Sequence, residues 1–444
     1  MKSSGLRTYT LTYCVALAVL AGCGGSSVGC ASGALPPSAT IAARTAQGAR
    51  QQWSESVIYA FQHLGGNYRP YAGLINVNGT LYGTTSGGDG SGAVYSISPS
   101  GPEKIVHAFR GGSDGLDPED TLVDVGGVLY GTTMQGGDSE CGQGYGCGTV
   151  FAIDPSSAGT EKVLYRFHGG LDGAVPYAGL VAIHGTLYGT TAGGGASFGG
   201  VSSCRCGTVF SINPASGRER ILYRFKGGSD GRNPYGNLLA LRNTLYGTTY
   251  VGGSSHCANG LPGCGTVFSL NIASQRERIV HVFQGSPTDG ANPTSGLTLM
   301  RGRLYGTTVA GGIATCTGFQ SSPCGTVFSI EPSSGQEDIV HFFKGDPDGL
   351  SPNAPLVASN GFLYGTTYYG GDSGSAFCGE SGCGTVFRLT AEGKERVLYS
   401  FQFTPDGAYP TAGLTSVNGA LYGTTVFGGT GAGDGGGTVF KLSP

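Results

Sequence analysis

The cysteines are the residues whose spacing points most directly to a chemical role. Ten of the 13 cysteines form five close pairs, and the second member of each pair directly precedes a glycine. Thiols at this spacing can form a local disulfide or bind zinc, but zinc needs four converging ligands and no histidine repeats beside the pairs. We therefore predict no metal site and five disulfides in an exported protein, the Cys-x-Cys pair being the most strained. The predicted pairs are Cys141–Cys147, Cys204–Cys206, Cys257–Cys264, Cys316–Cys324 and Cys378–Cys383.

Acidic residues recur at fixed places relative to the turns. A ring of carboxylates could bind a cation or a basic ligand, but Asp-Gly suits a turn, and near-identical copies favour a scaffold role. Residues 346–349 also lack the five spaced oxygen ligands of a calcium loop. The Asp-Gly aspartates are Asp114, Asp172, Asp230, Asp289, Asp348 and Asp406. A further set of glutamates, expected near the opposite face in structural or solvated positions, comprises Glu55, Glu103, Glu161, Glu219, Glu277, Glu337 and Glu395.

Histidines and catalytic motifs give little support to an enzyme. The chain has no Gly-x-Ser-x-Gly elbow, no His-Glu-x-x-His and no phosphate-binding loop. Three of the seven histidines, His107, His281 and His341, stand where other units carry tyrosine. We therefore expect their side chains to pack against neighbouring residues and not to be catalytic. We predict no catalytic residue and no cofactor.

Aromatic residues near the cysteine pairs differ from unit to unit. Exposed aromatic side chains on rigid loops commonly stack on sugars or anchor a protein partner. The alternative is that each one packs against its own cystine loop. The candidates for a ligand-binding face are Tyr145, Phe198, Tyr250, Phe319, Tyr368, Tyr369, Phe377 and Phe427.

All these residues belong to seven copies of one unit. The pentapeptide Leu-Tyr-Gly-Thr-Thr starts at Leu81, Leu129, Leu187, Leu245, Leu304, Leu363 and Leu421. Gly-Thr-Val-Phe (once Gly-Ala-Val-Tyr), an apolar segment ending in Phe, and a Pro four residues before a Leu accompany it in constant order. A unit that recurs at nearly constant spacing along the chain indicates an array, a solenoid or a propeller.

Each unit contains four short segments rich in β-branched and aromatic residues, separated by turn residues. In the third unit we expect strands A to D at 179–183, 186–191, 207–212 and 220–225. No segment has the 3.6-residue apolar period of a helix. Four antiparallel strands per repeat predict an all-β fold, a seven-bladed β-propeller of four-stranded antiparallel blades.

The phase of the repeat predicts how the ring closes. The folded part starts with a D-type strand at 57–61 and ends with a C-type strand at 437–442. The N-terminal outer strand can therefore complete the C-terminal blade, whereas an open array would leave two unpaired edges. In such a blade the B–C and D–A loops share a face, which makes that face the candidate for binding.

The N-terminus has the pattern of an export signal. Lys2 and Arg7 precede an uncharged apolar stretch, 11–20, that is too short to span a bilayer. The sequence that ends at Cys23 resembles the lipobox of bacterial lipoproteins, which implies cleavage before Cys23 and lipid attachment to its thiol. We expect a signal peptide at 1–22, a flexible tether at 23–52 and the propeller at 53–444. The resemblance favours the outer membrane or cell surface; an ordinary signal would give a periplasmic or secreted protein.

Composition excludes two classes of protein. Charged residues make up only 12% of the chain and the net charge is −3, which argues against a nucleic-acid binder. The 85 glycines and 21 prolines approach the range of disordered chains. The 20 Phe and 23 Tyr recur periodically, however, and supply a core.

The repeat also resembles a known family. The block Leu-Tyr-Gly-Thr-Thr, Gly-Gly, Gly-Thr-Val-Phe, apolar-Tyr-x-Phe, Asp-Gly, Pro-x-x-Gly-Leu is similar to the GloVer tandem repeat of bacterial surface proteins, described as choice-of-anchor, over about residues 55–444. The layout is also similar to kelch blades, whose second strand ends in Gly-Gly. The resemblance implies a propeller joined to a cell-surface anchor, and it implies no particular activity.

These observations predict a monomeric, lipid-anchored module for ligand binding or surface interaction. Its partners would be the membrane, through the lipid, and a glycan or another surface protein, but no nucleic acid. A carbohydrate-active enzyme using the loop-rich face is the alternative, and a structural or adhesion component is a third possibility. Two carboxylates within ~5–10 Å on that face would favour a glycosidase. An aromatic platform without such a pair would favour glycan binding.

Overall fold

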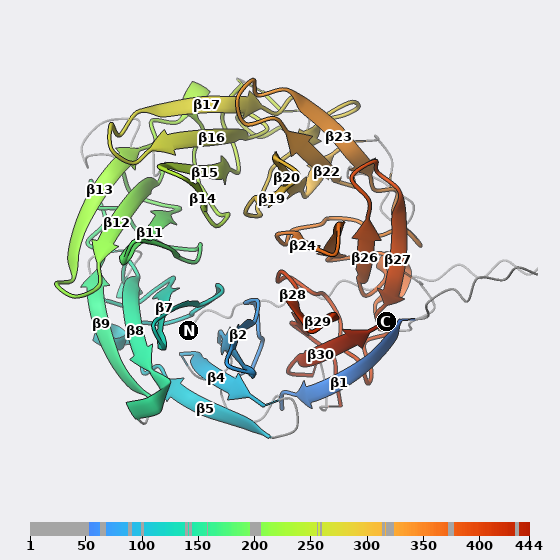
Figure 1. The fold of residues 1–444 in the computed structure, drawn as a ribbon, viewed down its shortest axis with the longest axis horizontal. Helices are drawn as coiled ribbons and strands as arrows, with labels where there is room; N and C mark the ends of the chain where they lie inside the picture. Colours follow the sequence, from blue (N-terminus) through green and yellow to red (C-terminus); the bar gives the residue numbers. More distant parts are fainter. Residues whose placement is uncertain are drawn as a thin grey trace, which may run out of the picture. The chain divides into compact units, whose positions relative to one another are not determined.

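The computed structural model describes residues 53–62, 68–87, 91–98, 102–137, 141, 144–157, 159–195, 206–254, 256–257, 260–312, 316, 324–371, 377–430 and 435–444. They belong to one compact unit, Gln51–Pro444. Seven four-stranded antiparallel sheets are arranged in a ring within this unit (Figure 1). The predicted all-β, seven-bladed propeller is thus confirmed. No helix in the described part of the chain has the length and apolar character needed to cross a membrane.

Each blade runs from the axis of the ring to its rim. The innermost strands are β2 (Ile75–Val77), β6 (Val123–Val125), β10 (Val181–Ile183), β14 (Leu239–Leu241), β19 (Thr298–Met300), β24 (Val357–Ser359) and β28 (Thr415–Val417). The second strands are β3 (Thr80–Thr85), β7 (Val128–Thr133), β11 (Thr186–Thr191), β15 (Thr244–Thr249), β20 (Arg303–Thr308), β25 (Phe362–Thr367) and β29 (Ala420–Thr425). Blades are numbered 1 to 7 in this order.

The two outer layers follow the same order. The third strands are β4 (Ala93–Ile97), β8 (Thr149–Asp154), β12 (Thr208–Asn213), β16 (Thr266–Asn271), β22 (Thr326–Ile330), β26 (Thr385–Leu389) and β30 (Thr438–Ser443). The outer strands are β5 (Glu103–Ala108), β9 (Thr160–Arg166), β13 (Arg218–Arg224), β17 (Glu277–Val282), β23 (Glu337–Phe342), β27 (Glu395–Ser400) and, for blade 7, β1 (Ser54–Ala60). A short pair, β18 (Gly290–Ala291) and β21 (Ala310–Gly311), links two loops of blade 5.

The ring is closed by the two ends of the described chain. Strand β1 pairs antiparallel with β30, from Ser54 opposite Ser443 to Ala60 opposite Thr438. Blade 7 therefore has the strand order β1-β30-β29-β28, and in Figure 1 the blue β1 lies beside the red β30. This pairing satisfies backbone groups of β30 that would otherwise form an open edge.

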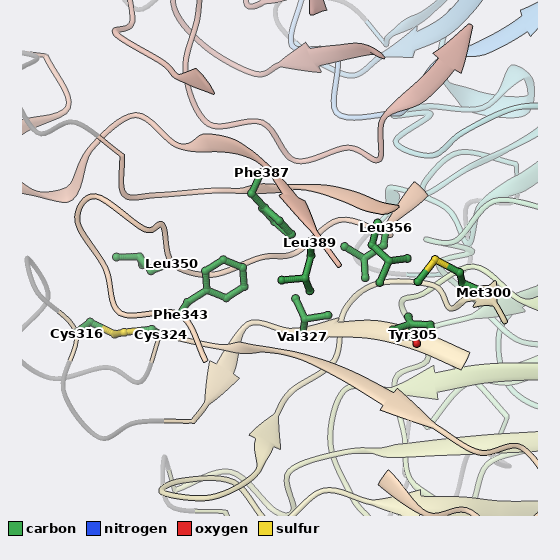
Figure 2. Close-up of a cluster of buried hydrophobic side chains, with 11 residues drawn as sticks. Met300, Tyr305, Cys316, Cys324, Val327, Phe343, Leu350, Leu356, Phe387 and Leu389 are labelled. Atoms are coloured by element: carbon green, nitrogen blue, oxygen red, sulfur yellow. A yellow bond between two sulfur atoms is a disulfide. The ribbon is translucent and has the colours of Figure 1, made fainter. Parts of the chain in front are cut away.

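The repeat residues have identifiable packing roles at every blade interface. The Phe that follows each outer strand packs edge-to-face on the aromatic residue of the next blade's third strand, as for Phe167 and Phe210 at 5.1 Å. The pattern continues through the closure, where Phe61 contacts Tyr95 at 5.1 Å. Figure 2 shows the interface between blades 5 and 6, where Phe343 and Phe387 meet at 5.2 Å. These rings exclude water from all seven interfaces, since edge-to-face pairs bury large apolar surfaces.

The glycine of Leu-Tyr-Gly-Thr-Thr is required by this packing. A Cβ on Gly189 would lie 2.6 Å from Cζ of Phe210 and 2.8 Å from a methyl of Leu180. The strand must therefore lack a side chain at this position so that the phenylalanine can lie across its backbone. The same close approach recurs in the other blades, which explains why the motif repeats without variation at its glycine.

The cystines pin loops between second and third strands. Disulfides join Cys141 to Cys147, Cys257 to Cys264, Cys316 to Cys324 and Cys378 to Cys383, so four of the predicted pairs are confirmed. Cys206 is also disulfide-bonded. Its predicted partner Cys204 lies outside the described residues. The bonds fit an extracytoplasmic protein, because disulfides persist in oxidising compartments.

Candidate functional site

A cavity of about 580 Å³ lies where the loops before the innermost strands converge. All seven blades contribute to its lining, mainly with the residues that follow the loop proline. Those residues precede the innermost strands, so the cavity lies at the axis of the ring. We call it the axial cavity. Tyr250 and Tyr368, from loops between second and third strands, also line it, so the two loop sets share a face as predicted.

The threonines of the repeat hold the cavity-lining loops in place. In every blade the first threonine of Gly-Thr-Thr donates a hydrogen bond to a loop carbonyl of the following blade. Thr84 in this way reaches the carbonyl of Asp120 at 3.4 Å, and Thr248 reaches that of Ser295 at 2.9 Å. In blades 2 to 7 the second threonine pairs with the threonine of the third strand, as in Thr191 with Thr208 at 2.8 Å. The motif thus builds a scaffold for the cavity and does not enter it.

Blade 2 departs from the repeat inside the axial cavity. Blades 1 and 3 have Tyr-Ala-Gly after the loop proline, whereas blade 2 has Glu119, Asp120 and Thr121. Both carboxylates are half-buried and line the cavity. A carboxylate pair in a single blade is the kind of asymmetry that distinguishes a functional site from a scaffold position.

Asp120 is held by groups from two further blades. One oxygen accepts the backbone N–H of Gly179 at 2.7 Å, and the other accepts from the side-chain amide of Asn237 at 3.2 Å. A Cβ on Gly179 would lie 2.7 Å from the carbonyl of Thr121, so only glycine permits this approach. Burial raises the pKa of Asp120 to about 6, although these hydrogen bonds act in the opposite direction.

Glu119 is a second perturbed carboxyl group in the same cavity. Burial, followed by the charge of Asp117, raises the pKa of Glu119 to about 7, while hydrogen bonds from Ser86 and Tyr177 lower it. The site therefore holds a carboxyl group that changes protonation near neutral pH. Such a group can donate or accept a hydrogen bond to a ligand hydroxyl, or transfer a proton.

Tyrosines form two arcs around the axial cavity. In one arc Tyr177 contacts Tyr235 at 5.3 Å, and Tyr235 contacts Tyr250 at 5.5 Å. In the other, Tyr368 stacks on Tyr409 at 5.0 Å with an interplanar angle of 18°. Burial raises the pKa of Tyr368 to about 12, so its hydroxyl is protonated at neutral pH and can donate.

The second arc extends outward through other predicted residues. Tyr369 contacts Tyr409 at 5.5 Å, and Tyr409 contacts Phe427 at 6.0 Å. The guanidinium of Arg69 lies 5.1 Å from the centre of the Phe427 ring, within the range of a cation–π contact. Tyr369 and Phe427 are therefore packed beside the cavity and do not line it.

The remaining predicted aromatics are not brought to the axial cavity. Phe377 is 69% exposed and stacks on Phe403 at 5.0 Å. Tyr145 is 62% exposed and lines a separate hollow with Arg166. The predicted Phe198 and Phe319 lie outside the described residues. Of the predicted ligand face, Tyr250 and Tyr368 are thus the two that the structure places in the cavity.

Most of the cavity lining lies away from the cysteine pairs, near which the ligand face was predicted. Tyr71, Tyr177, Tyr235, Glu119 and Asp120 all follow a loop proline. Aligning the seven copies on that proline would have exposed them, because the glutamate and aspartate occur there in one copy alone.

The aspartates of the Asp-Gly turns have the predicted scaffold role. Each accepts a backbone N–H from a residue four or five positions earlier, as Asp172 does from His168 at 2.7 Å. In three blades the aspartate also accepts a tyrosine hydroxyl of the outer strand, for example Tyr223 to Asp230 at 2.9 Å. These bonds fix the loop that leads to the axial cavity.

The recurring glutamates correct one sequence expectation. They were expected near the opposite face, but each of six interacts with an Asp-Gly aspartate of the preceding blade. Glu219, for example, lies near Asp172, and burial followed by that charge raises its pKa to about 7. The physical reason is that outer strands run along the rim, so the start of one reaches the end of the preceding one (Figure 1).

The fold and the cavity define a β-propeller with a ligand-sized axial site. The Gloeobacter/Verrucomicrobia repeat model matches residues 45–258, 144–378 and 257–444. The chain belongs to this repeat family, as the sequence predicted. A search of curated protein sequences finds no match.

Solved structures of several proteins show similarity at low sequence identity. Oligogalacturonate lyase from Vibrio parahaemolyticus has a TM-score of 0.48 and 9% identity, over 88% of this chain and 97% of that one. Aldose sugar dehydrogenase from Streptomyces coelicolor, in its PQQ-bound form, has a TM-score of 0.42 and 12% identity, over 88% and 98%. Puromycin hydrolase has a TM-score of 0.47 and 12% identity over 80% of this chain, which spans 50% of its length. These similarities concern the fold alone.

Proposed function

We propose that this protein is an extracytoplasmic binding module that takes a neutral saccharide into the axial cavity. The observation that carries this proposal is the convergence of Tyr71, Tyr177, Tyr235, Tyr250 and Tyr368 around one cavity. A volume of about 580 Å³ falls within the range of small-molecule sites. Tyrosine rings offer apolar faces to sugar C–H groups, and their hydroxyls bind sugar hydroxyls.

The polar groups of the cavity favour a ligand rich in hydroxyls and without negative charge. Glu119, Asp120, Asn237 and Asn353 supply acceptors and amide donors. Among the described residues that line the cavity there is no lysine or arginine. An acidic sugar would meet two carboxyl groups without a compensating cation, which disfavours it.

A glycan-binding screen on the purified chain tests this function. We expect binding of neutral oligosaccharides, and at least a tenfold loss in Tyr235→Ala, because the central ring of one arc is removed. Tyr145→Ala is the matched control, since Tyr145 is exposed outside the cavity. Absence of saccharide binding, or equal loss in both variants, would contradict the proposal.

A glycoside-cleaving enzyme is the second candidate, and the two carboxyl groups favour it. Glu119, with a pKa of about 7, has the property of a general acid, and Asp120 shares its cavity. Incubating the chain with each bound oligosaccharide and measuring new reducing ends distinguishes the two. If the wild-type chain cleaves and Glu119→Gln binds without cleaving, the protein is an enzyme. If neither cleaves, the cavity only binds.

We further propose that Cys23 carries a lipid that attaches the propeller to the outer membrane or cell surface, with residues 24–52 as the tether. This rests on the lipobox-like sequence at Leu20–Cys23. Cys23→Ser should abolish metabolic labelling by a fatty acid and release the protein from the membrane fraction. Retention of the variant on membranes would argue against the lipid anchor.

A further inference from the structure

At two blade interfaces the rim carries a histidine with two carboxylates. His107 and Asp114 of blade 1 meet Glu161 of blade 2, and their candidate ligand atoms all lie within 4.8 Å of one another. His281 and Asp289 of blade 4 meet Glu337 of blade 5 in the same arrangement. We call these the first and second rim clusters. Each draws its three side chains from two neighbouring blades.

The histidines in these clusters occupy a position where other blades have a tyrosine that hydrogen-bonds the aspartate, and they do not form that hydrogen bond. In blades 2, 3 and 6 a tyrosine occupies this position and donates to the aspartate, as Tyr399 does to Asp406 at 2.6 Å. His107 Nε2 instead lies 3.6 Å from Asp114, and His281 Nε2 lies 3.6 Å from Asp289. Both nitrogens are buried and have no hydrogen-bond partner. A buried polar atom without a partner costs free energy unless another group satisfies it.

The glutamates of the clusters also have buried polar atoms that lack a hydrogen-bond partner. One oxygen of Glu161 and one of Glu337 are buried without a hydrogen-bond partner. The second oxygen of Glu337 lies 3.9 Å from His281 Nε2. These separations are too long for hydrogen bonds but close to the ~3.3–3.5 Å between ligand atoms around a tetrahedral zinc ion with bonds of about 2.0–2.2 Å.

We propose that each rim cluster binds a divalent transition-metal ion, zinc in the first instance, which joins two neighbouring blades. Imidazole selects zinc and related ions over magnesium or calcium, and the two carboxylates neutralise its charge. Water would complete the coordination. A hollow of about 570 Å³ lined by His107, Asp114 and Glu161 provides a path for the ion to the first cluster. The sequence pattern alone predicts no metal site here, because the histidine and the two carboxylates come from two different repeats.

The two clusters should differ in affinity. Arg110 lines the hollow at the first cluster and carries a charge that opposes a cation. At the second cluster Asp338 lies beside Glu337, but it is paired with Arg303 at 2.6 Å and adds little net charge. We therefore expect the second cluster to retain its ion at lower free-metal concentrations than the first.

Reversion to the repeat's own residue gives a test that preserves folding. The chain is stripped with EDTA, equilibrated with micromolar zinc, desalted, and analysed for bound zinc by mass spectrometry of the metal. We expect two zinc ions per chain in the wild type, one in His107→Tyr or His281→Tyr, and none in the double variant. Zinc should also raise the melting temperature of the wild type and not that of the double variant.

A third histidine supplies the matched control. His341 Nε2 already hydrogen-bonds Asp348 at 3.2 Å, so His341→Tyr should leave zinc stoichiometry unchanged. Equal zinc content in the wild type and the double variant would overturn the proposal, as would no zinc in the wild type. Stoichiometric binding of magnesium or calcium in preference to zinc would overturn the assignment to imidazole ligation. Circular dichroism of the metal-free variants verifies that each is folded.

Discussion

The axial cavity and the rim are built from positions that occur in every blade, but the blades use them differently. After the loop proline the residue changes from Tyr71 to Glu119, and then to Tyr177 and Tyr235. At the start of the outer strand every blade has glutamate, and in six it interacts with an aspartate of the preceding blade. The cavity therefore gains asymmetry from single substitutions, whereas the rim repeats one contact between blades.

This difference separates ligand recognition from stability. A side chain at the axis contacts loops and the cavity, so changing it alters what the cavity can bind while the core keeps its packing. A side chain between blades is part of an interface on which closure of the ring depends. The rim clusters are the exception. The contact between aspartate and glutamate recurs around the ring, but in these two clusters a histidine replaces the neighbouring tyrosine.

The largest effect should come from removing an aromatic residue between blades. Phe225 is 1% exposed and packs on Phe268 at 5.1 Å. Phe225→Ala should lower the free energy of unfolding by about 3–5 kcal/mol, because it leaves a cavity in a close-packed interface. Chemical denaturation measures this change. Saccharide binding by the fraction that remains folded should be nearly unchanged, and an equal loss of affinity would break the separation between interface and cavity.

A substitution in the axial cavity should instead reduce saccharide affinity strongly and stability only slightly. Asp120→Ala introduces the residue of blades 1, 3, 6 and 7, but it removes the acceptor of the Asn237 amide and one of the two acceptors of the Gly179 N–H. We expect a stability loss of about 1–2 kcal/mol and a much larger relative loss of saccharide affinity. Calorimetric titration and denaturation on the same preparation compare the two. A large loss of stability with intact binding would assign Asp120 a purely structural role.

The rim carboxyl pairs should make stability depend on pH. Glu219 faces Asp172, with Tyr165 and Arg224 nearby, and burial followed by the Asp172 charge raises the pKa of Glu219 to about 7. Because this value exceeds that of the unfolded chain, the contribution is fully present below about pH 4.5 and is lost as the pH rises through 7. The melting temperature should therefore fall between pH 5 and 8.

A matched set of variants tests this origin. Glu219→Gln removes one titrating group, and the triple variant with Glu55→Gln and Glu395→Gln removes two more whose pKa values are raised to about 7 and about 8. The decline in melting temperature with pH should become shallower at each step. Glu392→Gln, at an exposed carboxyl group, is the control and should keep the wild-type slope. An unchanged slope in the triple variant would show that the rim pairs do not control it.

The smallest effect should come from an aromatic residue that belongs to neither region. Tyr145 is 62% exposed and lies in a loop closed by the Cys141–Cys147 disulfide. Tyr145→Ala should change stability by less than about 0.5 kcal/mol, as surface substitutions usually do. It should also leave saccharide affinity unchanged. A loss of binding would extend the ligand site outward from the axis, toward the cystine loops.

Sequence reasoning was most accurate where the repeat itself carried the signal. The second strand of blade 3 occupies the predicted residues 186–191, because alternation and turn residues mark both its ends. The innermost strand is shorter than predicted, Val181–Ile183 in place of 179–183, because Gly179 turns toward Asp120. Local propensity could not foresee this, since Asp120 and Asn237 lie 59 and 58 residues away from Gly179.

The amino-acid sequence by itself determined the blade number, the strand order and the cystine loops, because each is a local pattern repeated along the chain. The tertiary structure decided which residues meet at the axis and along the rim. Glu119, Tyr177, Tyr235 and Tyr368 become neighbours of one cavity only when the ring brings blades 2, 3, 4 and 6 around it. The glutamates meet their aspartates only because the outer strands run along the rim from one blade to the next. The physical reason is that closure of the ring creates contacts between residues one or more repeats apart, and no local pattern encodes those distances.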